Sequence, residues 1–107
     1  MKNNRLIADF MGNHKMIPLR YDSSWSELMP VVEKIESMMN NKHGLSLLTV
    51  HIIGRATSIH TTGACSYNGT NLYERIKLHH VRTFGKTKIE GCHMAVVEFI
   101  KLHNEYG

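Results

Sequence analysis

The sequence has few of the features that mark secreted, membrane-bound or disulfide-stabilised proteins. Its 107 residues include two cysteines and two prolines, and two cysteines are too few for a disulfide framework. No apolar run approaches the roughly 20 residues that a membrane helix needs, and the N-terminal residues lack the apolar core and cleavage site of a signal peptide. We therefore expect a cytoplasmic protein with free thiols and no membrane partner.

Motifs of the common enzyme classes are also missing. The chain has no phosphate-binding glycine loop, no G-x-S-x-G motif and none of the usual zinc-ligand spacings. Cys92, His93 and His103 lie in one segment, but a helix would place the first two about 100° apart and the third roughly 16 Å further along its axis. We therefore predict no metal, no cofactor and no catalytic residue. The alternative that the other histidines converge on a metal ion in the fold stays open.

The length and the apolar content indicate one domain. A chain of 107 residues is long enough to bury a modest core without disulfides or metals. Hydrophobic residues make up 42% of it, as in ordinary globular proteins. There is no linker, repeat or low-complexity segment, so residues 1–107 are predicted to form a single domain.

Three segments have the apolar periodicity of amphipathic helices, namely residues 3–12, 24–40 and 87–104. An apolar stripe along such a helix usually faces the core. The stripes predict that the core includes Trp25, Val32, Ile35, Val96 and Ile100.

Two of these helices begin with the spacing of a capping box, in which a hydroxyl residue is followed three positions later by Glu or Gln. In one helix the pair is Ser24 and Glu27, and in the other it is Thr87 and Glu90. Pro30 lies early enough in its helix to bend it without breaking it.

The middle of the chain has the pattern of β-strands. Residues 45–53 are apolar and β-branched, and every second side chain shares a face. Gly54 and Arg55 suit a two-residue turn with glycine first, so 56–62 is the expected return strand. Residues 79–84 predict another strand, and 72–78 fit either a strand or a helix. Together these segments predict an α+β fold, a small antiparallel sheet covered by two or three helices.

Positive charge is concentrated in this middle part. The net charge is +4, yet residues 37–89 hold seven Lys and Arg side chains against one acidic residue, Glu74. This composition suits binding to a nucleic-acid backbone, or to a protein that itself holds nucleic acid. A merely solvated basic face is the alternative. The candidate binding residues are Arg55, Arg75, Lys77, His79, His80, Arg82, Lys86 and Lys88.

This hypothesis predicts how reversing the charge of basic residues changes binding. Changing Arg82, Lys86 and Lys88 to Glu is expected to abolish binding, whereas reversing Lys34, in the charge-balanced first third of the chain, is expected to do little. The same residues leave one enzymatic alternative open, a small metal-independent ribonuclease. His79 and His80 would then act as acid and base beside a cation that holds the phosphate.

Three stretches resemble a known group of proteins. NRLIADFMG (4–12), YDSSWSELMPVVEKIES (21–37) and AVVEFIKLHN (95–104) are similar to small proteins of phages and prophages of Bacteroidales-like bacteria, which resemble the phage ABA-sandwich group. The resemblance covers both ends, about a third of the chain, and leaves out the basic middle (41–84). It implies a thin domain with a sheet between helices, and the group has no assigned catalytic residues.

The resemblance also implies a phage accessory protein that works by binding in the cytoplasm of the host bacterium. We therefore expect a non-enzymatic inhibitor of host defence, an anti-CRISPR protein that engages an RNA-guided nuclease or its guide RNA through the basic surface. The alternatives are a stand-alone nucleic-acid-binding protein, the ribonuclease and a structural phage component.

Overall fold

The computed structural model describes residues 2–12, 20–38, 48–61 and 71–106. Expectations for Met39, residues 45–47 and Cys65 therefore lie outside the described residues. The predicted α+β class is confirmed by seven elements. In chain order they are α1 (Lys2–Met11), α2 (Trp25–Ser37), β1 (Leu48–Ile53), β2 (Ala56–Thr61), α3 (Asn71–Leu78), β3 (Val81–Phe84) and α4 (Lys88–Tyr106).

The strands form an antiparallel sheet in the order β1-β2-β3. Ile53 pairs with Ala56 across the first turn, and Gly54 has a φ of +56°. Glycine adopts a positive φ at no steric cost, which is what a two-residue hairpin turn with glycine first requires. The predicted hairpin is confirmed, and β3 completes the sheet by pairing with β2.

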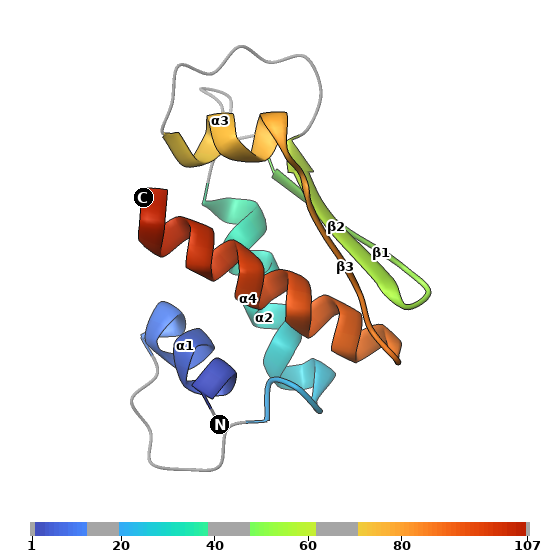
Figure 1. The fold of residues 1–107 in the computed structure, drawn as a ribbon. Coiled ribbons are helices and arrows are strands. Elements are labelled where there is room, and N and C mark those ends of the chain that lie inside the picture. Colours follow the sequence, from blue (N-terminus) through green and yellow to red (C-terminus); the bar gives the residue numbers. More distant parts are fainter. Residues whose placement is uncertain (1, 13–19, 39–47, 62–70, 107) are drawn as a thin grey trace.

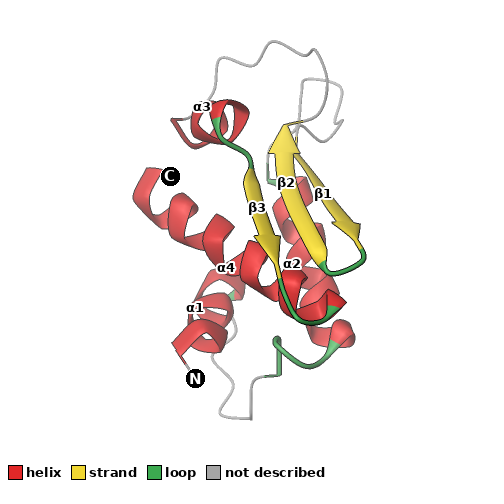
Figure 2. Cartoon of the chain, turned by 45° about the vertical axis from the view of Figure 1, so that its right-hand side comes forward, coloured by secondary structure: helices red, strands yellow, loops and turns green. Residues whose placement is uncertain are grey.

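The helices lie on one face of this sheet. Helix α4 packs against β2 and β3, and α2 packs against β1. Helix α1 contacts α4 on the side away from the sheet, and α3 lies near the end of the sheet opposite the β1–β2 turn (Figure 1). The layers are therefore the sheet, then α2 and α4, then α1. Among the described residues no helix covers the other face, which is turned toward the viewer in Figure 2.

Helix α4 is the centre of the core. The sheet packs on one side of it and α1 on another, so between Gly91 and Ile100 it is buried except at Met94 and Glu98. The predicted burial of Val32, Ile35, Val96 and Ile100 is confirmed. Trp25 is only half-buried, because it begins α2 and packs against the core from its rim.

The two predicted capping boxes have different outcomes. At α4 the hydroxyl oxygen of Thr87 accepts a hydrogen bond from the backbone N–H of Glu90 (3.2 Å), and Oε1 of Glu90 accepts one from the N–H of Lys86 (3.2 Å). At α2 the prediction is wrong: the Ser24 side chain makes no capping hydrogen bond, and its hydroxyl lies 2.9 Å from that of Ser26.

Residues 72–78, which the sequence left undecided, belong to helix α3. The backbone N–H of His79 still donates to the carbonyl of Arg75 (2.9 Å), in the manner of a helical turn. The predicted strand at 79–84 therefore begins two residues later, at Val81.

A close backbone contact fixes the β1–β2 turn against the start of α4. The N–H of Gly85 donates to the carbonyl oxygen of Arg55 (3.1 Å), and the hydroxyl of Thr83 donates to the carbonyl of Gly91 (2.6 Å). A Cβ at Gly91 would lie 2.1 Å from the Arg55 oxygen. Only glycine allows this approach, which gives the turn that carries Arg55 a fixed position.

Candidate nucleic-acid interface

The uncovered face of the sheet is built by strand alternation. Successive side chains of a strand point to opposite faces, so the register between strands defines which residues share a face. We call the uncovered surface the open face. From the β1–β2 turn toward the other end, its rows are Ile53–Ala56–Phe84, then His51–Ser58–Arg82, then Thr49–His60 with His80 just before β3.

The open face combines exposed apolar groups with cations. Ile53 is 64% exposed and Phe84 63% exposed. The guanidinium of Arg55 lies over the Phe84 ring, 4.6 Å from its centroid, a cation–π contact that holds the charge beside the sheet. Arg82 is also exposed, and the three strands contain no Asp or Glu. Such a surface favours an anionic partner that also offers planar or apolar groups.

Three imidazole rings lie close together on the open face, His51 in its middle row and His60 and His80 in the row farthest from the β1–β2 turn. The ring centroids of His51 and His60 are 6.2 Å apart, and those of His60 and His80 are 5.5 Å apart. Within the described ranges, no group of three or more His, Cys, Asp and Glu side chains is arranged to hold a metal ion. The rings offer planar surfaces and hydrogen-bonding nitrogens.

The eight predicted binding residues do not form one patch. Arg55, His80 and Arg82 border the open face, and Lys86 and Lys88 are exposed beyond β3, at the turn end of the sheet.

The other three lie at the opposite end, on α3 and in the bend that follows it (Figure 1). There the Arg75 guanidinium donates to the carbonyl of His79 (2.7 Å) at the C-terminal end of α3, and Lys77 is exposed. These residues extend the positive charge but do not line the open face.

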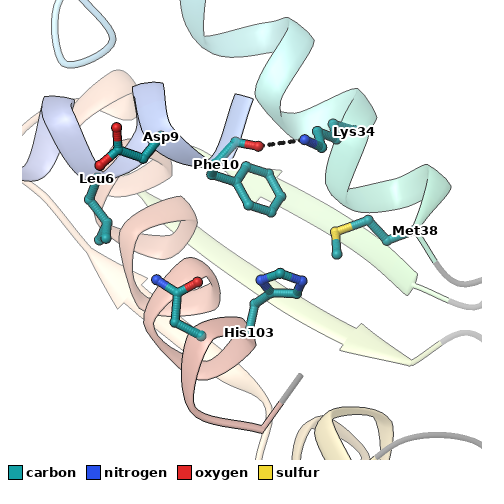
Figure 3. A pocket seen from close by; sticks show the side chains of 7 residues that line it. Leu6, Asp9, Phe10, Lys34, Met38 and His103 are labelled. Atoms are coloured by element: carbon teal, nitrogen blue, oxygen red, sulfur yellow. Dashed lines mark hydrogen bonds between the residues drawn. The ribbon is translucent and has the colours of Figure 1, made fainter. Parts of the chain in front are cut away.

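A hollow of about 330 Å³ lies between α1, α2 and α4, away from the open face (Figure 3). The Lys34 ammonium donates to the carbonyl of Phe10 and lies 4.4 Å from the centroid of its ring. The His103 ring meets the same ring edge-on at 5.5 Å. Lys34 therefore joins two helices, so its reversal is expected to lower stability, while the expectation that it has little effect on binding stays a prediction.

A line of polar groups ties α1 to α4 and to the loop before α2. Nε2 of His93 lies 3.1 Å from Oδ1 of Asn4, and the Asn4 amide donates to Asp22 (3.0 Å). Since the amide nitrogen faces Asp22, the amide oxygen accepts from His93. Burial lowers the pKa of His93, and the hydrogen bond from Asn4 lowers the pKa of Asp22. Asn4 and His93 are buried and Asp22 is half-buried, which indicates a structural role.

Cys92 is fully buried on α4. Burial raises the pKa of its thiol to about 11, so the thiol stays protonated at neutral pH and is a poor nucleophile. The sequence-based expectation of a core cysteine is confirmed.

Comparisons with known proteins add no relative. A scan against protein-family models, a search of curated proteins and a search of solved structures each gave no significant match. In the part of the chain that the structure describes, no helix has the length and apolar character to cross a bilayer.

Proposed function

We propose that this chain is a non-enzymatic binding protein whose open face contacts single-stranded RNA. The observation that supports it is the open face itself, where exposed Phe84, Ile53 and histidine rings lie among arginines on strands without acidic residues. Unstacked RNA bases stack on aromatic and guanidinium planes, while Lys and Arg pair with the phosphates. Both kinds of group are needed for such binding, and both are present here.

The exposed apolar groups favour a single strand over a duplex. In an RNA duplex the bases are stacked inside, and proteins recognise its shape, phosphates and 2′-hydroxyls. Phe84 and Ile53 would gain little from such contacts. A single strand laid across the sheet offers them bases.

The biological setting of the proposal comes from the resemblance to phage accessory proteins. We propose that the RNA belongs to a host-defence ribonucleoprotein, as the guide of an RNA-guided nuclease does, in the cytoplasm of the host bacterium. Covering a guide would inhibit such a nuclease without any reaction by the inhibitor.

The test is binding to a short fluorescent single-stranded RNA, followed by anisotropy at several salt concentrations. One variant changes Arg82, Lys86 and Lys88 to Glu. Its matched control changes three exposed cations away from the open face to Glu, with the same change in net charge. These are Arg5, Arg20 and Lys101.

We expect the wild-type protein to bind the single strand more tightly than the duplex. The variant with Arg82, Lys86 and Lys88 reversed should lose binding, and the slope of log K against log salt should fall by up to about 2 if three phosphate contacts are lost. Phe84→Ala should weaken binding roughly 5- to 150-fold, the range for one stacked base. Equal losses in both triple variants, or an unchanged affinity in Phe84→Ala, would refute the proposal.

One observation favours a second candidate, the metal-independent ribonuclease. The rings of His60 and His80 lie 5.5 Å apart beside the row that holds Arg82, which resembles an acid–base pair next to a phosphate-binding cation. Under our proposal, labelled RNA incubated with the protein and a chelator stays intact. Cleavage that disappears in both His60→Ala and His80→Ala would favour the ribonuclease instead.

A further inference from the structure

The open face is hollowed along its middle strand. On β2 the face carries Ala56 and Ser58, which are small, whereas the paired positions on the outer strands carry large side chains. This contrast leaves a cavity of about 230 Å³ above the middle strand. Its lining includes His51, Ile53, Ala56, Ser58 and Arg82.

The size and the walls of the hollow restrict what it can hold. Pockets for drug-sized molecules have volumes of roughly 300–1,000 Å³, so this one suits a single ring system. Its two walls stand on β1 and β3, which are two strand spacings or roughly 10 Å apart. One wall is Ile53 and the His51 ring, and the other is the Arg82 side chain, so a flat group fits between an apolar side and a cationic side.

We infer that this hollow seats one unstacked nucleobase of single-stranded RNA, an inference that rests on the proposed function. The Arg82 guanidinium is planar, so it both stacks on a base and donates hydrogen bonds to acceptors on the base edge. The Ser58 hydroxyl at the floor is both a donor and an acceptor. Because no acidic residue lies on the strands, the phosphates on either side of the base meet no negative charge there.

The rings of His60 and His80 set the position of the hollow along the strand. One row beyond Ser58, the middle strand carries His60, whose ring lies between those of His51 and His80. A large ring at this position ends the line of small side chains. The base is therefore seated between the β1–β2 turn and the rings of His60 and His80, and its neighbours along the RNA extend toward Phe84 on one side and toward these two rings on the other.

The test compares an intact RNA with an abasic oligonucleotide of the same backbone. Ala56→Leu fills the hollow without changing the charge of the protein. Ser58→Leu fills it one row away and replaces the first variant if circular dichroism shows that Ala56→Leu folds poorly. Ser26→Leu is the control for an added apolar side chain, because Ser26 is exposed on α2.

We expect the wild type to prefer intact RNA over the abasic strand. Ala56→Leu should reduce this preference by roughly 5- to 150-fold, the range for one seated base, and should bind the abasic strand as the wild type does. Ser26→Leu should behave as the wild type with both strands. If both filled variants keep the full preference, the hollow holds no base, although the proposed function stands. If the wild type binds neither strand, the proposed function fails and the inference with it.

Discussion

Gly91→Ala tests the contact that joins helix α4 to the β1–β2 turn. In an exposed helix this substitution would stabilise the protein by about 1 kcal/mol, because alanine is the better helix former. Here the new Cβ would lie 2.1 Å from the carbonyl oxygen of Arg55, and real Cβ atoms essentially never come closer than 3.0 Å to such an atom. The helix and the turn must therefore separate by nearly 1 Å.

The cost follows from what this separation disturbs. Overfilling a packed interface costs roughly 1–3 kcal/mol. The separation also weakens the hydrogen bonds from Gly85 to Arg55 and from Thr83 to Gly91, each of which contributes about 0.5–1.5 kcal/mol. After the gain in helix propensity is set against these losses, we expect the free energy of unfolding to fall by roughly 3 kcal/mol. That is a large share of the about 5–15 kcal/mol that stabilises a domain.

Urea unfolding followed by circular dichroism measures this loss. With a slope of about 1–3 kcal/mol per molar for a small protein, the midpoint should fall by roughly 1–3 M. Glu98→Ala, at an exposed position of the same helix, is the control and should stay within about 0.5 kcal/mol of the wild type. A Gly91→Ala protein as stable as the wild type, or more stable, would show that the turn does not rest on α4 as described.

The further predictions concern polar groups that join α1 to the rest of the fold. The pKa of His93 is lowered by burial from 6.5, so the unfolded chain binds the proton more readily and stability should fall as pH drops through about 6.5. The lowered pKa of Asp22 adds stability above pH 3.8 that is lost as pH falls through its folded value. Urea midpoints at pH 7 and pH 5 measure the first step, which His93→Gln should flatten; an equal slope in that variant would contradict the assignment. Lys34→Glu should destabilise by about 1–3 kcal/mol, because a carboxylate replaces the cation beside the Phe10 carbonyl and ring; a melting temperature equal to that of Lys101→Glu would show that this contact is not stabilising.

Most of the fold could be predicted because its signals are local. Periodicity located the three predicted helices, and Gly54 located the hairpin turn. Helix α3 was different, since its short apolar pattern fits both the period of a helix and the period of a strand. Tertiary packing decides it, because Leu72 and Ile76 are buried one helical turn apart.

The candidate site was predicted only in part, because charge is visible in a sequence and strand pairing is not. Arg55, His80 and Arg82 were found by their charge or their basic neighbours. His51 and His60 lie in segments with little charge, and only the register of β1 with β2 brings them onto the open face. The sequence did contain the information needed to place them. The position of the turn predicts which residues pair across the two strands, and the two-residue period predicts which of these pairs share a face.

Because every other element packs on α4, the order of synthesis on the ribosome matters for this chain. Helices α1 and α2 have 10 and 13 residues, and isolated helices shorter than roughly 12–15 residues are marginal in water. A lone two-stranded hairpin is marginal as well. The nascent chain therefore has no lasting core until residues 92–100 have left the exit tunnel. Until then its apolar helix faces are exposed to chaperones, proteases and neighbouring nascent chains, so the yield of folded protein depends on how quickly the last helix is made.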